Sequence, residues 1–126
     1  MPLRLLTIGL LLVLASCSSS RYMETNLYFG QSKPNGSMIT EEEWSHFKEK
    51  QIARVFKEGS TTVKAVGSWY DPVSKKLISE PTYIVTYYHK KSPKISKQID
   101  SLTNLYKDLF QQQSILRVDK KVKVHF

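Results

Sequence analysis

The segment Leu77–Phe110, "LISEPTYIVTYYHKKSPKISKQIDSLTNLYKDLF", contains the two periodicities that decide the fold. Its first part, to His89, is rich in β-branched and aromatic residues and predicts a strand, in which Pro81 requires an edge or a bulge. Ser92-Pro93 then starts a helix, because proline is favoured in the first helical turn. The apolar stripe of this helix has a 3.6-residue period and consists of Ile95, Ile99, Leu102, Leu105 or Tyr106, Leu109 and Phe110.

The residues before this segment show the same alternation of strand and helix. A short strand at Leu27–Phe29 stops at Gly30. A helix begins at Thr40, where Glu43 three residues later completes a capping box. Residues 61–70 alternate in polarity and predict a second strand. The apolar face of the first helix consists of Trp44, Phe47, Ile52, Val55 and Phe56, with Gln51 as its single polar exception.

The last segment, residues 114–126, predicts a final strand with a bulge or a short bend near Asp119. Its apolar residues occupy even positions: Leu116, Val118, Val122, Val124 and Phe126. The order β-α-β-β-α-β predicts an α+β, ferredoxin-like fold, with two helices on one face of a four-stranded antiparallel sheet. An α+β meander of the same elements is the alternative.

The other face of such a sheet has no helices over it and would expose the side chains of one strand parity. The sequence does not decide which parity this is. Apolar and aromatic side chains there would indicate a partner, such as a second copy packed sheet to sheet. The candidates are Val66, Tyr70 and Tyr83.

The N-terminus has the layout of an export signal. Arg4 precedes an apolar run, Leu5–Leu14, which is followed by small residues. The run is shorter than the roughly 20 residues that span a bilayer. Leu14 to Cys17, "LASC", resembles the bacterial lipobox, in which the cysteine thiol takes a diacylglyceryl group and cleavage leaves the cysteine first. We therefore predict a lipoprotein signal peptide (1–16), a lipidated Cys17 with a tether (17–25), and one α+β domain (26–126).

The predicted lipid anchor indicates where in the cell the protein is located. Two or three acyl chains on Cys17 make membrane attachment effectively permanent. Cys17 is the only cysteine, so no intramolecular disulfide can form. Ser18, rather than an aspartate, follows it, which resembles the form sorted to the outer membrane of Gram-negative bacteria. The predicted location is the cell envelope, on the outer membrane facing the periplasm.

The net charge of the chain limits the kinds of partner that we predict. Residues 17–126 carry eighteen basic and eleven acidic side chains, a net charge of +7. A basic protein raises the question of nucleic acid, but the export signal argues against it and leaves the membrane surface or lipopolysaccharide as the nearby anion. The predicted partners are membrane lipid, through acylated Cys17, and an envelope protein or a second copy.

Nearly all of residues 26–126 resemble the domain of unknown function family 3574, whose members are often small bacterial lipoproteins. The resemblance supplies no catalytic residues. Lys57 and Ser60 depart from the family pattern, which usually has a proline and an apolar residue there. The matching features are "LYFG" (27–30), Phe56, Gly59 and Thr61 as F-x-x-G-x-T, Gly67 with Trp69, Glu80, Tyr106, Phe110, "QQSILRV" (112–118) and a V-x-V-x-F end.

No motif for catalysis or metal binding is present. The histidines, His46, His89 and His125, lack metal-ligand spacing, so we predict no metal and no cofactor. Glu80 and Arg117 each interrupt an apolar strand, and on neighbouring strands they would form a bidentate pair. The favoured interpretation is an ion pair on the open sheet face.

The sequence therefore predicts a non-catalytic envelope binding or interaction module. The alternative is a small-molecule enzyme of the dimeric ferredoxin-like type. In that enzyme Arg117 would bind an anion, Glu80 would act as general acid or base, and Trp69 and Tyr83 would wall the pocket.

Overall fold

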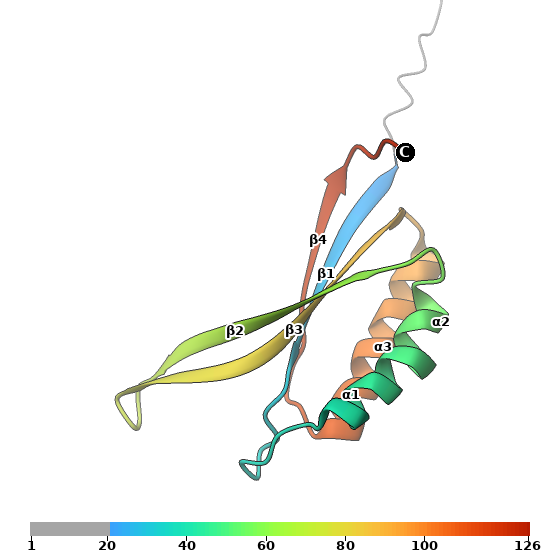
Figure 1. Cartoon of the computed structure of the whole chain (residues 1–126). Helices are drawn as coiled ribbons and strands as arrows, with labels where there is room; N and C mark the ends of the chain where they lie inside the picture. Colours follow the sequence, from blue (N-terminus) through green and yellow to red (C-terminus); the bar gives the residue numbers. More distant parts are fainter. Residues whose placement is uncertain (1–20) are drawn as a thin grey trace, which may run out of the picture.

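The computed structural model describes residues 21–126, which form a four-stranded sheet with a layer of helices on one face (Figure 1). The strands are ordered β2-β3-β1-β4, and every neighbouring pair is antiparallel. This topology confirms the predicted ferredoxin-like fold and excludes a simple meander, because β1 lies between β3 and β4. The elements are β1 (Tyr22–Gly30), α1 (Glu41–Phe47), η1 (Lys48–Ile52), α2 (Ala53–Val55), β2 (Thr61–Asp71), β3 (Lys76–Lys90), α3 (Pro93–Phe110) and β4 (Leu116–Val122).

The first strand is longer than predicted. It begins at Tyr22, so residues 22–25, predicted as tether, belong to the sheet. The side chain of Thr25 is buried in alternation with those of Leu27 and Phe29. Because threonine carries a hydroxyl, the apolar pattern of the strand did not extend to this position. The predicted signal peptide, Cys17 and the rest of the tether lie outside the described residues. Within residues 21–126, no helix is both long enough and apolar enough to cross a bilayer.

The first helix contains a π-helical turn, η1, that explains its polar exception. Phe47 and Ile52 are both buried although they are five residues apart, a spacing that a regular α-helix would place on different faces. The wider turn between them rotates Ile52 onto the core and leaves Gln51 half-buried. Thr40 caps this helix with the predicted capping box.

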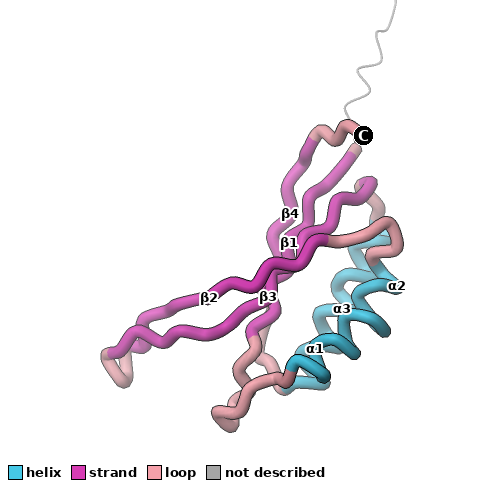
Figure 2. Tube along the Cα trace, in the orientation of Figure 1, coloured by secondary structure: helices cyan, strands magenta, loops and turns pink. Residues whose placement is uncertain are grey.

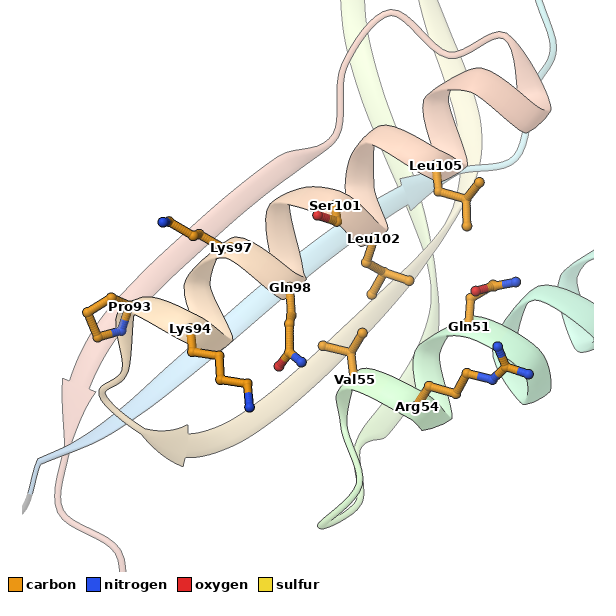
Figure 3. Close-up of a pocket in the computed structure, with 10 residues that line it drawn as sticks. All are labelled: Gln51, Arg54, Val55, Pro93, Lys94, Lys97, Gln98, Ser101, Leu102 and Leu105. Atoms are coloured by element: carbon orange, nitrogen blue, oxygen red, sulfur yellow. The ribbon is translucent and has the colours of Figure 1, made fainter.

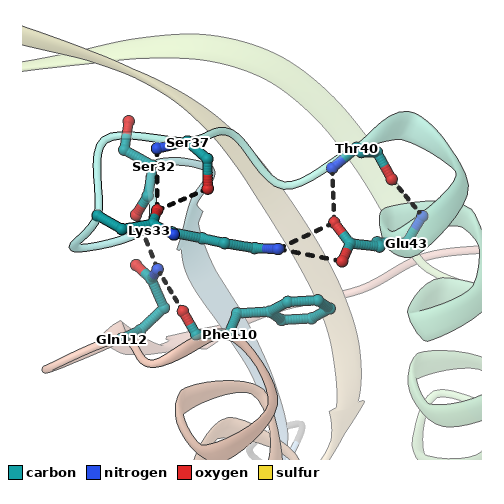
Figure 4. Close-up of polar contacts among 8 residues, drawn as sticks. Ser32, Lys33, Ser37, Thr40, Glu43, Phe110 and Gln112 are labelled. Carbon is teal, nitrogen blue, oxygen red and sulfur yellow. Dashed lines mark hydrogen bonds and ion pairs between the residues drawn. The ribbon is translucent and has the colours of Figure 1, made fainter.

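The long helix α3 has the predicted start, with Ser92 as N-cap and Pro93 in the first turn. Four of its predicted apolar positions are buried: Ile99, Leu102, Tyr106 and Phe110. Leu109 is instead more than half exposed. The helix ends at Phe110, and its C-cap residue, Gln111, has a left-handed conformation (φ 56°). Gln112 then donates its side-chain amide to the carbonyls of Phe110 (3.1 Å) and Ser32 (2.8 Å), and so caps the C-terminal end of the helix (Figure 4).

The loop between β1 and α1 contacts both α1 and α3. Lys33 Nζ donates to the Glu43 carboxylate at 3.1 and 3.3 Å (Figure 4). The same carboxylate accepts from the backbone of Thr40 at 2.8 Å, and these contacts together hold the pKa of Glu43 below its usual value. Lys33 Nζ also lies 6.0 Å from the ring centre of Phe110.

The hairpin of β2 and β3 extends beyond the rest of the sheet (Figure 2). β1 ends at Gly30, opposite Thr82, so residues 67–71 and 76–80 pair only with each other. We call residues 67–80 the hairpin arm. Pro81 lies in β3 beside the hairpin arm. Its backbone nitrogen, which has no N–H, faces the end of β1, where no hydrogen bond from it is needed. Only the Pro81 carbonyl is used there, and it accepts from the backbone N–H of Gln31 at 3.0 Å.

The register settles which face is open. Lys64 lies opposite Tyr83, and Tyr83 is buried under the helices. Val66 and Tyr70 share that parity, so none of the three predicted open-face residues lies on the open face. In β4 the even-numbered residues point away from the helices, since Leu116 pairs with Tyr28 rather than with a buried residue. The register runs unbroken past Asp119, so the predicted bulge is absent, and the strand stops at Val122.

Candidate functional site

The structure does not bring Glu80 and Arg117 together. The prediction that their strands are neighbours is wrong, because β1 separates β3 from β4. Their side chains also lie on opposite faces: Glu80 pairs with Gly67 on the open face, whereas Arg117 pairs with buried Leu27 on the helix side. They form neither an ion pair nor the two walls of one pocket.

Glu80 holds the end of β1. Its Oε1 accepts a hydrogen bond from the backbone N–H of Ser32 at 3.0 Å. The carboxylate lies over Gly30, where an added Cβ would come within 2.6 Å of the same oxygen. Glycine at position 30 therefore leaves the space that Glu80 occupies.

Arg117 is engaged by three residues on two elements, α3 and β4. Its guanidinium bonds Asp100 of α3 at 2.7 Å and Asp119 of β4 at 2.9 Å. It also donates to the carbonyl of Ser96 (3.3 Å) and to its hydroxyl (3.1 Å). The predicted anion-binding role would require the guanidinium to exchange these carboxylates for a ligand.

Trp69 and Tyr83 do not share a site. Trp69 lies in the hairpin arm opposite Ile78, and half of its surface is exposed. Tyr83 is buried and stacks on Trp44, with ring centres 4.4 Å apart. Its hydroxyl donates to Glu41 at 2.9 Å; hydrogen bonds from Lys64 and Tyr83 hold the pKa of Glu41 below its usual value.

A buried polar cluster that the sequence analysis missed lies at the end of the sheet where β1 begins. His89 Nε2 lies 2.8 Å from Thr25 Oγ1, and that hydroxyl donates to Asp119 Oδ1 at 2.6 Å. Thr25 is fully buried and His89 is 3% exposed. The three residues come from β1, β3 and β4, so the cluster joins three strands. Its signal was periodicity: Thr25 is in phase with Leu27, and His89 with Tyr87.

The hydrogen-bond partners in this cluster indicate which of its atoms donate and which accept. His89 Nδ1 faces the carbonyl of Lys90 at 2.9 Å, and a carbonyl only accepts. Because the Thr25 hydroxyl gives its proton to Asp119, it accepts from His89 Nε2. The imidazole ring also stacks on Tyr87, with ring centres 4.9 Å apart. Each polar group of the cluster is therefore occupied, and none is left as a free base or nucleophile.

One concavity, of about 500 Å³, is lined by both Trp69 and Glu80, and another, of about 310 Å³, is lined by Glu41 and Tyr83. Two further concavities adjoin the polar cluster and the helices. One, of about 310 Å³, is lined by His89, Lys91, Ser96, Arg117 and others beside the polar cluster. The second is a groove of about 610 Å³ between the first helix and α3 (Figure 3). Val55, Leu102 and Leu105 contribute apolar surface to it, and Figure 3 shows Lys94 and Gln98 extending toward Val55. Both are open, and no group of three potential metal ligands occurs in residues 21–126.

The open face of the sheet carries an apolar row across all four strands. The row follows the register: Val63 pairs with Ile84, Ile84 with Tyr28, and Tyr28 with Leu116. We call these four residues the apolar row. Its ends are more than half exposed, 52% at Val63 and 58% at Leu116, and no helix lies over it. This row is the candidate binding surface.

The apolar row has polar neighbours on the open face. Thr86 donates to Asn26 Oδ1 at 2.6 Å, and Asn26 donates to Glu24 at 2.7 Å. The next row toward the arm contains Ala65, Thr82 and Gly30. An apolar centre with a hydrogen-bonded polar margin is the usual composition of a protein interface.

Topology, core and open face define a small α+β domain of the ferredoxin-like class. The chain belongs to the family described as "Protein of unknown function (DUF3574)", whose model matches residues 24–126. None of the curated proteins matches this sequence.

Similar folds occur among solved structures. A phage SAM lyase in complex with S-methyl-5'-thioadenosine superposes with a TM-score of 0.60 and 14% identity, over 80% of this chain and 81% of that chain. CutA from Synechococcus elongatus PCC7942 gives a TM-score of 0.52 and 9% identity, over 82% of this chain and 80% of that chain. These likenesses show a shared fold.

Proposed function

We propose that this protein is a membrane-anchored bacterial lipoprotein of the cell envelope, whose domain is a non-catalytic interaction module. The lipobox-like "LASC" sequence supports attachment through acylated Cys17 on the outer membrane facing the periplasm. The observation that carries the binding role is the exposed apolar row on a sheet face that no helix covers. Exposed contiguous apolar surface marks interaction sites in monomeric domains.

The occupant of this face is a second copy of the chain. Residues 17–126 carry a net charge of +7, yet the open face is balanced. A neutral face lets two copies pack sheet to sheet without the repulsion that their other surfaces would produce. The charged residues of this face are Glu24, Asp71, Glu80, Lys76, Lys90 and Lys120.

The hairpin arm supplies additional contact area. Trp69, which shares the open-face parity of Val63, is 53% exposed, whereas Val66 and Tyr70, 71% and 61% exposed, lie on the opposite side. A two-stranded ribbon without a third layer is marginally stable in water. Contact with a second copy would cover this ribbon on at least one side.

The enzyme alternative gains no support from the geometry. Glu80 and Arg117 face opposite sides of the sheet, and Trp69 is distant in register from Arg117. The polar cluster of Thr25, His89 and Asp119 is internally satisfied. The likeness to a SAM lyase, at 14% identity, concerns the fold.

The anchor is tested by Cys17→Ala in a Gram-negative host. The wild type should partition into the detergent phase of a Triton X-114 extract, and the variant should leave it. Cys17→Ala that partitions like the wild type would contradict the lipoprotein assignment.

The interface is tested by light scattering on the mature chain with Cys17→Ser. We expect a dimer at tens of micromolar, converted to monomer by Leu116→Lys or Val63→Lys. Leu109→Lys is the matched control, because Leu109 is as exposed as Leu116 but lies on α3. A monomeric parent chain would overturn self-association. Photo-crosslinks from position 63 in intact envelopes would then report whether another envelope protein occupies the face.

A further inference from the structure

We propose that the end of the domain where β1 begins is a docking surface for anionic phospholipid headgroups. This inference rests on the proposed anchor at Cys17 and adds a contact made by the folded domain itself. Six exposed cations gather there; we call them the basic end. They are Arg21, Lys90, Lys91, Lys120, Lys121 and Lys123.

The sheet register brings these cations together. Tyr22 lies opposite Lys90 on one side and Val122 on the other, and Met23 lies opposite Lys121. The backbone N–H of Lys91 donates to the carbonyl of Arg21 at 2.6 Å. The beginning of β1 and the ends of β3 and β4 therefore form one edge of the molecule, seen near the C-terminus in Figure 1.

Charge is distributed unequally along the molecule. The opposite end, where α1 begins, carries the acidic run Glu41–Glu43, in which Glu41 pairs with Lys64 and Glu43 with Lys33. At the basic end the strands contain two acids, and both are engaged: Glu24 with Asn26, and Asp119 with Thr25 and Arg117. The lysines of the basic end thus exceed the local acids, and an external anion can balance them.

The anchor places this end, and no other, beside the membrane. Cys17 precedes Tyr22 by five residues, and an extended chain of that length spans at most about 18 Å. Lysine side chains at the strand ends shorten the remaining gap, and electrostatic attraction extends over a Debye length of about 10 Å. The tether therefore holds the basic end within range of the headgroups.

An exposed aromatic residue accompanies the charges. Phe126 is fully exposed, and its ring lies 6.4 Å from that of Tyr22, edge to face. Cationic side chains beside an exposed aromatic ring are the composition of surfaces that bind the membrane interface. An anionic lipid surface satisfies both the charges and the apolar ring, which a small soluble anion does not.

The experiment is co-sedimentation of the mature Cys17→Ser chain with vesicles of phosphatidylcholine containing 30% phosphatidylglycerol. We expect binding that is lost in pure phosphatidylcholine and that weakens in high salt. Each membrane-proximal lysine contributes about fivefold to affinity. Lys90→Gln, Lys91→Gln, Lys120→Gln and Lys121→Gln combined should therefore weaken binding at least tenfold.

The matched control removes the same charge elsewhere, through Lys48→Gln, Lys50→Gln, Lys75→Gln and Lys76→Gln. It should change affinity less than threefold. Equal losses in the two variants would show that net charge alone attracts the vesicles and would overturn the proposal, as would equal binding to neutral vesicles. Thermal unfolding of both variants checks that the fold is retained.

The outcome is separable from that of the anchor. Failure of Cys17→Ala to change detergent partitioning would remove the anchor but leave vesicle binding as measured. Conversely, absence of vesicle binding by the Cys17→Ser chain would overturn the docking surface while the lipoprotein assignment stands.

Discussion

Gly30 and Glu80 share one space: the carboxylate of Glu80 lies where a side chain at position 30 would begin. A Cβ on Gly30 would approach Glu80 Oε1 to 2.6 Å, and that oxygen accepts from the backbone of Ser32. Because Gly30 has no side chain, the Glu80 carboxylate can lie over it and accept the backbone hydrogen bond of Ser32 just after β1 ends.

Gly30→Ala should displace Glu80 and break its bond to Ser32, lowering the free energy of unfolding by about 1 kcal/mol. Urea denaturation measures it. In a Glu80→Ala background the same change should have little effect, because nothing remains to displace. Gly67→Ala is the control, since its Cβ would meet the Thr82 hydroxyl at an ordinary 3.4 Å. Equal effects of Gly30→Ala in both backgrounds would contradict the shared space.

Thr25→Val keeps the shape of the side chain but removes the hydroxyl that links His89 to Asp119. Buried His89 loses the partner of its Nε2, and Asp119, which keeps its ion pair with Arg117, loses one hydrogen bond, so unfolding should become easier by about 2 kcal/mol. Thr25→Ser should retain most of the stability. Thr62→Val, on the same sheet face, is the control and should be nearly neutral. A Thr25→Val protein as stable as the wild type would show that the hydrogen-bonded chain contributes nothing.

Tyr106 predicts a specific loss of stability at alkaline pH. Burial raises the pKa of its hydroxyl, which donates to the carbonyl of Gly30 at 2.8 Å. Above about pH 10 the unfolded chain ionises this tyrosine while the folded chain keeps its proton, so stability falls with rising pH.

The measurement is the free energy of unfolding of the wild type and Tyr106→Phe between pH 8 and 11. The advantage of the wild type should shrink by about 1.4 kcal/mol per pH unit above pH 10. Tyr70→Phe, in the exposed arm, should leave the pH profile unchanged. Parallel profiles for wild type and Tyr106→Phe would refute the prediction.

Glu80 and Arg117 should behave as independent residues. Because β1 separates their strands, a double-mutant cycle of Glu80→Gln and Arg117→Met should give a coupling energy within about 0.5 kcal/mol of zero. The cycle of Arg117→Met with Asp100→Asn should instead show coupling, since those side chains lie 2.7 Å apart. Strong Glu80–Arg117 coupling would restore the predicted ion pair.

Much of the fold was predictable because its signals are local. The capping box at Thr40, the Ser92-Pro93 helix start and the α3 stripe each depend on residues a few positions apart. The ferredoxin-like order followed from their succession. The π-turn was hidden, although the five-residue gap between Phe47 and Ile52, with Gln51 inside it, is its trace in the sequence.

The surfaces were less predictable because they depend on register and strand order. β2 has apolar residues on both faces, so its alternation could not show whether Val63 or Val66 faces the helices. The pairing of Glu80 with Arg117 assumed adjacent strands, and adjacency is a property of the whole topology. The cluster at Thr25 escaped a search for spaced catalytic motifs because its members are 64 and 94 residues apart.

The position of β1 has a mechanical consequence. The strand β1 has a neighbour on each side. It pairs with β3 over all of residues 22–30 and with β4 over residues 22–28. Antiparallel ladder bonds run perpendicular to the strands, so a pull on residue 21 along β1 loads them simultaneously in shear. An edge strand pulled sideways would instead unzip one bond at a time. The lipid anchor that we propose would therefore transmit tension to the part of the sheet best able to resist it.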